Sequence, residues 1–199
     1  MANFGKETDG ASTTTINDAD GDNKWVSTAT PSSSGTVTSL TSRFSVTAGS
    51  VNVRGIIYSD NAGAPGTLLA VTDDGNFTNT TEQANSLNFT GGNQISIVSG
   101  TPYWIGLHWQ SPAGGNMTLS RDATANLRRT SDGTDTFSGG TDSGFGTPST
   151  LSGPVDTYVT YSTASGPANL KSFSTNLKAN VKSINTNLIA NVKSYNTNV

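Results

Sequence analysis

The sequence predicts an all-β protein: a jelly-roll-like β-sandwich followed by a C-terminal repeat. Three observations lead to this prediction. Short apolar segments alternate with clusters of Gly, Pro, Ser, Asn and Asp, at the spacing of about 8–12 residues that is typical of sandwiches and barrels. Apolar residues make up only 32% of the chain, so burial must be thin and spread over short segments. Residues 169–199 repeat an 11-residue unit.

The clearest predicted strands lie in the first third of the chain. Residues 36–46 place Leu40 and Phe44 on one face and Val37 on the other, which predicts a strand buried on one face. Residues 51–58 are rich in β-branched side chains and end at a turn cluster, residues 59–66, in which Pro and Gly shape a tight loop. The segment around Trp25 is surrounded by turn-forming residues and is expected to form an edge strand.

Shorter strands are expected along the rest of the first 163 residues. They are placed at residues 68–71, 86–90, 94–98, 103–109, 117–121, 126–130 and 155–162. Residues 131–153 consist mainly of Gly, Ser, Thr and Asp, and only Phe137, Phe145 and Leu151 can anchor them. We expect a long surface loop or a loosely held hairpin there.

The chain divides into a sandwich domain and a tail. Residues 1–163 form the predicted sandwich, residues 164–168 the linker and residues 169–199 the repeat. The repeat follows the template N-[LV]-K-S-[FIY]-[SN]-T-N-[LV]-x-A, with the last copy cut short. Its apolar positions are Leu170, Phe173, Leu177, Val181, Ile184, Leu188, Val192, Tyr195 and Val199.

The repeat is compatible with two secondary structures. The 3,4,4 spacing of the apolar positions is that of a right-handed helical supercoil. However, Asn, Thr, Ser and β-branched residues are poor helix formers, and residues 184–192 alternate apolar with polar. A β-rich stalk is therefore favoured, with a helix as the alternative.

The apolar stripe of the tail needs a partner in either case. Three short units offer no second layer, so a lone tail cannot bury its stripe. We therefore expect a homo-oligomer, most simply a trimer around a narrow axis, in which Asn176, Asn187 and Asn198 recur as matched polar layers.

Composition excludes several other partners. The net charge is -3, with 11 basic and 14 acidic residues, so the chain lacks the basic field that gathers nucleic acid. No apolar stretch approaches the roughly 18 residues that span a membrane, and the opening residues do not read as a signal peptide. The chain has no cysteine. A polar, cysteine-free chain of this kind fits a virion or an extracellular assembly.

No catalytic constellation is evident. His108 is the only histidine, which excludes a catalytic triad and a multi-histidine metal site. The acidic residues lie mainly in Gly/Ser/Thr loops, without the strand ends and aromatic neighbours that a glycoside hydrolase requires. We therefore predict that the protein is not an enzyme and needs no cofactor.

Two residue sets remain as candidates for ligand contact. Trp104 and Trp109 differ in strand parity, so at least one is expected at the surface or at an interface, and with His108 they are the candidates for glycan contact. Asp18, Asp20 and Asp22 have the opening spacing of a calcium loop. They lack the Gly and Glu of an EF-hand, so they are weak candidates and no metal is predicted.

Several motifs resemble a known family. Residues 58–70 (YSDNAGAPGTLLA) and 100–107 (GTPYWIGL) resemble the paired signature of jelly-roll modules in bacterial secreted proteins and in phage and metagenomic virion proteins. Residues 2–6 and the strand that begins at Gly35 fit the same pattern, whereas residues 18–22 depart from it. The tail resembles the Asn/Lys-rich short repeats that end many phage-like structural proteins. The resemblance implies a jelly-roll fold and a virion or secreted setting.

Together these features predict a structural protein of a virion or an extracellular assembly, such as a decoration, fibre or filament component. It is expected to self-associate through residues 169–199 and to contact other structural proteins. A carbohydrate-binding adhesion module is the alternative.

Overall fold

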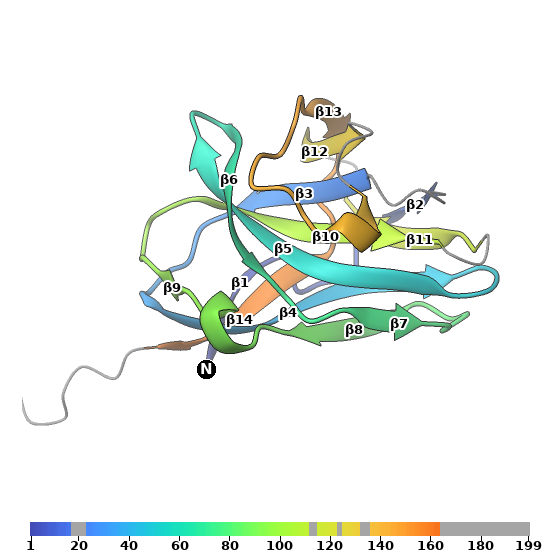
Figure 1. Ribbon diagram of the computed structural model, residues 1–199, viewed down its shortest axis with the longest axis horizontal. Coiled ribbons are helices and arrows are strands. Elements are labelled where there is room, and N and C mark those ends of the chain that lie inside the picture. The colour runs from blue at the N-terminus through green and yellow to red at the C-terminus, as the bar shows by residue number, and fades with distance from the viewer. Residues whose placement is uncertain (17–22, 112–114, 123–124, 132–135, 164–199) are drawn as a thin grey trace, which may run out of the picture. The chain divides into compact units, whose positions relative to one another are not determined.

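The computed structural model describes residues 1–16, 23–111, 115–122, 125–131 and 136–163, with side chains for all of these except residues 125–131 and 151–152. Residues Met1–Thr163 form one compact unit. Figure 1 shows this unit as strands arranged in two layers, linked by loops and two short 3₁₀ helices. The predicted all-β class is confirmed for the described part of the chain.

Sheet A contains seven of the described strands, with β4 at its centre. One edge of β4 pairs with β14 and β11 placed end to end, and these pair in turn with β1 and β2; the other edge pairs with β8 and β9. The strands are β1 (Ala2–Gly5), β2 (Ser12–Ile16), β4 (Gly35–Val46), β8 (Gln83–Asn88), β9 (Ser96–Ile97), β11 (Met117–Arg121) and β14 (Thr157–Thr163).

Sheet B contains the other seven described strands in the order β13-β12-β3-β10-β5-β6, and β7 extends the line of β6 along β5. They are β3 (Asn23–Ala29), β5 (Val51–Asn61), β6 (Ala64–Val71), β7 (Gly75–Phe77), β10 (Tyr103–Gln110), β12 (Ala125–Ser131) and β13 (Ser149–Ser152). The helices η1 (Gly91–Asn93) and η2 (Phe137–Gly139) lie in connections. Every pairing is antiparallel.

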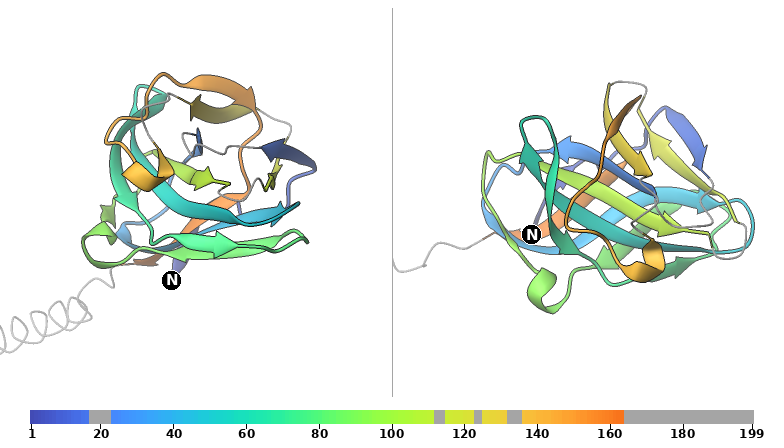
Figure 2. Two further views of the ribbon diagram at one scale, coloured as in Figure 1. Left: turned by 45° about the vertical axis from the view of Figure 1, so that its right-hand side comes forward. Right: turned by 45° about the horizontal axis from the view of Figure 1, so that its top comes forward.

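The strand order is that of a jelly roll. From β2 onward the chain passes repeatedly from one sheet to the other, and the two views of Figure 2 show the sheets wrapped around a common interior. The central orders β1-β14-β4-β8 and β3-β10-β5-β6 are the two four-stranded sheets of a double Greek key. This confirms the predicted fold of the sandwich from its own topology.

The core lies between the two sheets. It is built from inward residues of β4, β5, β10, β11 and β14, and Phe4 of β1 contributes an aromatic contact to Tyr161, with ring centroids 5.8 Å apart. Because successive side chains of a strand point to opposite faces, each inner strand supplies apolar residues at alternate positions. The described residues contain no helix long and apolar enough to cross a membrane.

Two details differ from the sequence expectations. The segment around Trp25 forms β3, which lies between β10 and β12 and is therefore not an edge strand. Val37 and Leu40 are both fully buried, although simple alternation places them on opposite faces. The reason is a bulge in β4: Thr160 pairs with Ser39 and Tyr161 with Val37, so Thr38 is an extra residue that reverses the parity.

Candidate functional site

The three side chains expected to contact glycan all lie on β10. The alternation predicted for this strand is correct: Tyr103, Ile105, Leu107 and Trp109 face the core, while Trp104 belongs to a second apolar cluster on the other face. The expected exposure is wrong. Trp104 is 3% exposed, and His108 and Trp109 are fully buried. A glycan on the protein surface would not reach these rings.

The outer face of sheet B is buried because a later part of the chain folds over it. We call residues 136–148, which follow β12 and lead into β13, the cover segment. Phe137 and Phe145 of this segment are 4% and 2% exposed. The Phe145 ring meets Tyr58 edge-on at 5.2 Å, and the Phe137 ring lies 5.4 Å from His108. Most residues of this segment are exposed, as expected for a surface loop, and two of the three residues that the sequence singled out anchor it to the sheet.

A buried arginine ties η2 to sheet B. The Arg54 guanidinium donates two hydrogen bonds to Asp74, at 2.9 and 3.0 Å, in the bidentate geometry that carboxylates favour. Its Nη2 also donates to the carbonyl oxygen of Phe137 at 2.9 Å, and its Cζ lies 3.9 Å from the centre of the Phe137 ring. Arg54 thus donates to the backbone carbonyl of Phe137 and also stacks on the Phe137 ring.

Arg54 belongs to a row of three basic side chains across sheet B. His108 of β10 pairs directly with Arg54 of β5 on one side and with Lys24 of β3 on the other. Lys24 is fully buried; its ammonium donates to the Gly144 carbonyl oxygen at 3.3 Å and lies 5.4 Å from the Phe145 ring. His108 Nδ1 is 2.8 Å from the hydroxyl of Thr141.

The three side chains of this row hold the cover segment against sheet B. Each of its three members contacts a different part of that segment, near residues 137, 141 and 144. Sequence reasoning missed Lys24 and Arg54, although a weak signal existed: each lies two positions from an apolar residue, Val26 or Ile56, of the outer cluster. Strand alternation places Lys24 and Arg54 on the same face as these apolar residues, and the cover segment is what buries that face.

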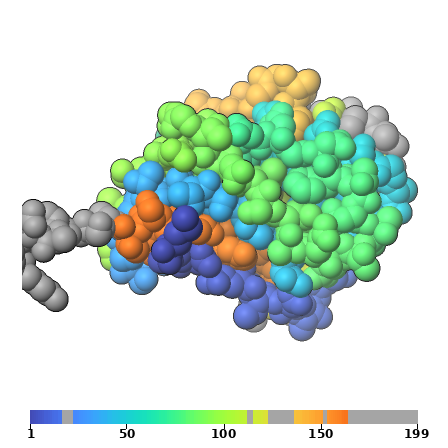
Figure 3. Space-filling model, turned by 90° about the horizontal axis from the view of Figure 1, so that it is seen from below, coloured from blue at the N-terminus to red at the C-terminus, as the bar shows by residue number. Residues whose placement is uncertain are grey.

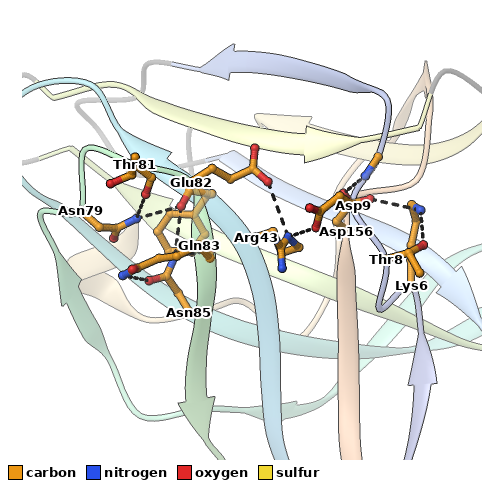
Figure 4. Close-up of polar contacts among 12 residues, drawn as sticks. Lys6, Thr8, Asp9, Arg43, Asn79, Thr81, Glu82, Gln83, Asn85 and Asp156 are labelled. Carbon is orange, nitrogen blue, oxygen red and sulfur yellow. Dashed lines mark hydrogen bonds and ion pairs between the residues drawn. The ribbon is translucent and has the colours of Figure 1, made fainter.

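A second cluster of charges holds the N-terminal residues to sheet A. Asp156, which directly precedes β14, has a fully buried side chain whose Oδ2 accepts a hydrogen bond from the backbone N–H of Gly10. Lys6 lies 3.7 Å from Asp156 and 3.2 Å from Asp122. Figure 4 shows Lys6 and Asp156 side by side, and Figure 3 shows the N-terminal residues lying along β14 on the molecular surface.

Arg43 extends this cluster along β4. It forms ion pairs with Asp9 and with Glu82, the latter at 3.5 Å, so that it lies between the N-terminal segment and the start of β8 (Figure 4). Asn79 and Asn85 next to it both donate to the carbonyl oxygen of Phe44, at 2.8 and 3.2 Å. These contacts connect three distant stretches of sequence, mostly through exposed or half-buried side chains, with Asn85 buried.

Burial is the main cause that raises the pKa of the Asp156 carboxyl. The Gly10 N–H and the Lys6 charge lower it, and the nearby Asp122 and Asp9 charges raise it further. A carboxyl with a raised pKa is a candidate general acid only where it faces a substrate. A cavity of about 310 Å³ lies close by, and Val155 and Thr157 line it. Asp156 is not among the residues that line this cavity, and its Oδ2 accepts from the Gly10 N–H, so its role is to hold the N-terminal segment in place.

Two predicted residue sets lie outside the described residues. They are the calcium candidates Asp18, Asp20 and Asp22, and the nine apolar positions of the tail from Leu170 to Val199. Among the residues that the structure does describe, no group of three or more His, Asp or Glu side chains is placed to hold a metal ion.

The comparisons with known proteins assign no family. No protein-family model matches the chain, and no curated protein matches its sequence. Among solved structures, "Structure of infectious bursal disease virus Gx strain" matches with 13% identity over 84% of this chain and 49% of that chain, at a TM-score of 0.27. The infectious bursal disease virus VP2 subviral particle matches with 14% identity over 74% and 39%, at a TM-score of 0.26.

The chain spans less than half the length of these two viral chains. Both TM-scores are below 0.5, so neither likeness carries the fold or the function over to this protein. The jelly-roll assignment rests on the strand order described above.

Proposed function

We propose that this chain is a structural protein of a virion or an extracellular assembly, in which the jelly-roll domain is the exposed head and residues 169–199 associate with copies of themselves. One observation carries the proposal. The tail repeats an 11-residue unit with nine apolar positions on one stripe, and 31 residues cannot bury such a stripe alone. Burial of apolar surface, at about 25 cal/mol per Å², is the driving force for association.

The surface of the described jelly-roll domain supports the proposal that the tail, and not the head, carries self-association. Its core is closed, and the large apolar side chains that stay exposed in the described residues are Met1, Leu69 and Val98, from three separate parts of the chain. Contiguous apolar patches mark association surfaces, whereas scattered apolar residues do not. The head therefore offers little apolar surface for self-association, and the tail is the better candidate.

The finer features of the proposal follow from the repeat. Three chains enclose a narrow axis with the stripe inward, so we propose a trimer. Asn176, Asn187 and Asn198 recur at the 11-residue interval and would form matched polar layers that set the register between chains. Other structural proteins of the same particle are the proposed partners of the head. A polar, cysteine-free composition supports the virion or extracellular setting.

The test is the mass of the full-length protein in solution. The double substitution Ile184→Asp with Leu188→Asp places two charges on the stripe and is expected to convert the oligomer to a monomer. A matched control, Ser183→Asp with Asn185→Asp, adds the same charge at neighbouring polar positions and should leave the oligomer intact. Analytical ultracentrifugation measures both, together with a chain that ends after Gly166. The same number of chains per particle in the intact, stripe-substituted and shortened proteins would refute self-association through the tail.

A further inference from the structure

A polar cleft lies at the end of sheet B, beside the β5–β6 hairpin that stands out from the body in Figure 1. Three short stretches line it: residues 59–61 at the end of β5, residues 65–67 at the start of β6 and residues 144–146 of the cover segment. Its volume is about 560 Å³, inside the range of about 300–1,000 Å³ that small-molecule sites occupy. The lining comes largely from residues 58–70, the motif whose turn cluster was expected to shape a tight loop.

The cleft exists because the β5–β6 ladder opens there. Tyr58 pairs with Leu68 and Asp60 with Pro65, so the single residue Ser59 faces both Gly66 and Thr67. Ser59 Oγ accepts a hydrogen bond from the Thr67 backbone N–H at 2.9 Å. Such a bulge re-aims the strand and recurs next to binding sites. A Cβ on Gly66 would lie 2.7 Å from Ser59 Oγ, so the absence of a side chain at position 66 keeps this part of the cleft open.

The tight turn of the hairpin is made by two residues that precede this bulge. Ala62 and Gly63 have φ of 52° and 84°, the left-handed values of a two-residue hairpin turn. Pro65 lies beyond the turn, within β6, and is buried. Of the Pro and Gly residues expected to shape the loop, Gly63 does form the turn, whereas Pro65 and Gly66 line one wall of the cleft.

Asp60 is held in position by donors from two different elements. The buried Trp104 indole of β10 donates to Oδ1 at 2.8 Å, and the Gly63 backbone N–H of the hairpin turn donates to Oδ2 at 3.2 Å. A carboxylate has about four acceptor sites, and these two bonds use one on each oxygen. The turn bond alone would stabilise the hairpin, whereas the indole bond fixes the direction of the carboxylate. The result is a pre-oriented acceptor at the edge of the cleft.

The remaining lining offers both donors and acceptors without any positive charge. Asn61 and Thr67 are exposed and contribute an amide and a hydroxyl. Gly144 and Gly146 are exposed and carry no side chains, which leaves their peptide groups close to the surface. Asp60 is the only charged residue in the lining. A ligand for this cleft must donate to a carboxylate, accept from an amide and tolerate a negative charge.

We propose that the cleft binds neutral oligosaccharides. A sugar hydroxyl is both donor and acceptor, which matches the mixed lining, and a neutral sugar meets no repulsion from Asp60. An anionic ligand would be repelled by the Asp60 carboxylate. Calcium is not a fitting ligand either, because a single carboxylate supplies too few oxygens for it. An added peptide strand is blocked, because Gly144 already bridges to Thr67 and the Ser143 carbonyl accepts from the Leu68 N–H at 2.7 Å.

This site differs from the one that the sequence suggested. Trp104 takes part as a positioning residue, through its bond to Asp60, and not as a stacking platform. The inference does not rest on self-association through the tail. Its test uses a single soluble ligand and a binding constant per chain, so the oligomeric state leaves the result unchanged.

The experiment screens the full-length protein against an array of neutral oligosaccharides and against sialylated ones of matched backbone. Calorimetric titration of the best neutral oligosaccharide then compares the intact protein with Asn61→Ala and with Gly66→Val, which fills the cleft. Asn93→Ala, at an exposed asparagine of η1, is the matched control. Thermal melting checks that every variant is folded. If Gly66→Val does not fold, the comparison of Asn61→Ala with the intact protein still tests the proposal.

We expect a neutral oligosaccharide to bind and Asn61→Ala to weaken its binding by about tenfold, the loss of one well-placed hydrogen bond. Folded Gly66→Val should lose binding, and Asn93→Ala should retain it. The proposal is overturned if no neutral oligosaccharide binds, if sialylated ones bind as tightly, or if Asn61→Ala and Asn93→Ala bind alike.

Discussion

Replacing Phe145 with alanine should loosen the cover segment and destabilise the whole domain. The ring is 2% exposed, meets Tyr58 edge-on at 5.2 Å and lies 5.4 Å from the Lys24 ammonium. Removing a buried phenylalanine ring from a core costs about 3–5 kcal/mol. The cluster around Phe145 is small, and the segment has independent attachments such as the Tyr58 hydroxyl to the Asp142 carbonyl at 3.0 Å. We therefore expect a loss of about 3 kcal/mol in the free energy of unfolding.

Urea denaturation followed by far-UV circular dichroism measures this loss, and hydrogen exchange shows whether residues 136–148 lose protection first. Leu69→Ala is the control, because Leu69 is 37% exposed on β6 and should lose less than about 1 kcal/mol. If Phe145→Ala lost no more than Leu69→Ala, and exchange in the cover segment were unchanged, the segment would not be part of the packed interior.

Three further predictions concern other parts of the domain. Arg54→Lys should lower the free energy of unfolding, measured in urea, by about 1–3 kcal/mol, because lysine cannot make the bidentate bond to Asp74. A variant as stable as the parent would contradict the role of Arg54 in holding the cover segment to sheet B. Gly106→Ala should lower the free energy of unfolding by about 3 kcal/mol or more, because its Cβ would lie 1.9 Å from the carbonyl oxygen of Trp25 in the neighbouring strand. The loss is measured as a lower melting temperature, and an unchanged melting temperature would mean that β3 and β10 separate easily. Burial raises the pKa of Asp156 in the fold, so its contribution to stability is present below the ordinary pKa of an aspartate and is lost as pH rises through the folded pKa. Asp156→Asn should not lose stability in this way, so its free energy of unfolding should rise relative to that of the parent as pH increases above about 4. Urea denaturation at a series of pH values measures the difference, and parallel stability curves for the two proteins would contradict the prediction.

The β10 strand shows how far sequence reasoning reaches. Alternation correctly divided Trp104 from Trp109, because side-chain parity is a local property of an extended chain. Whether the Trp104 face meets water depends on Phe145, which lies 41 positions later and gives no local sign of its destination. The expectation that at least one of these two tryptophans is exposed was therefore wrong, because the residue that covers Trp104 is distant in sequence.

Pairing register was hidden from the sequence in the same way. The extra residue Thr38 in β4 reverses the parity of Val37, and the unequal pairing at Ser59 opens the cleft beside β6. Both irregularities belong to a strand together with its partner, and the partner of Val37 is 124 positions away in the chain, at Tyr161. A turn motif such as residues 59–66 predicted a change of direction but not the cleft next to it.

The sequence by itself determined the features that depend on neighbours along the chain: the positions of most strands and turns, the all-β class, and the 11-residue period of the tail. The tertiary structure decided which strands are central, which face of sheet B is covered, and where Lys24, His108 and Arg54 come together. The physical reason is that strand pairing and sheet packing join residues far apart in sequence. Their register is selected by the free energy of the whole sandwich and not by local propensity.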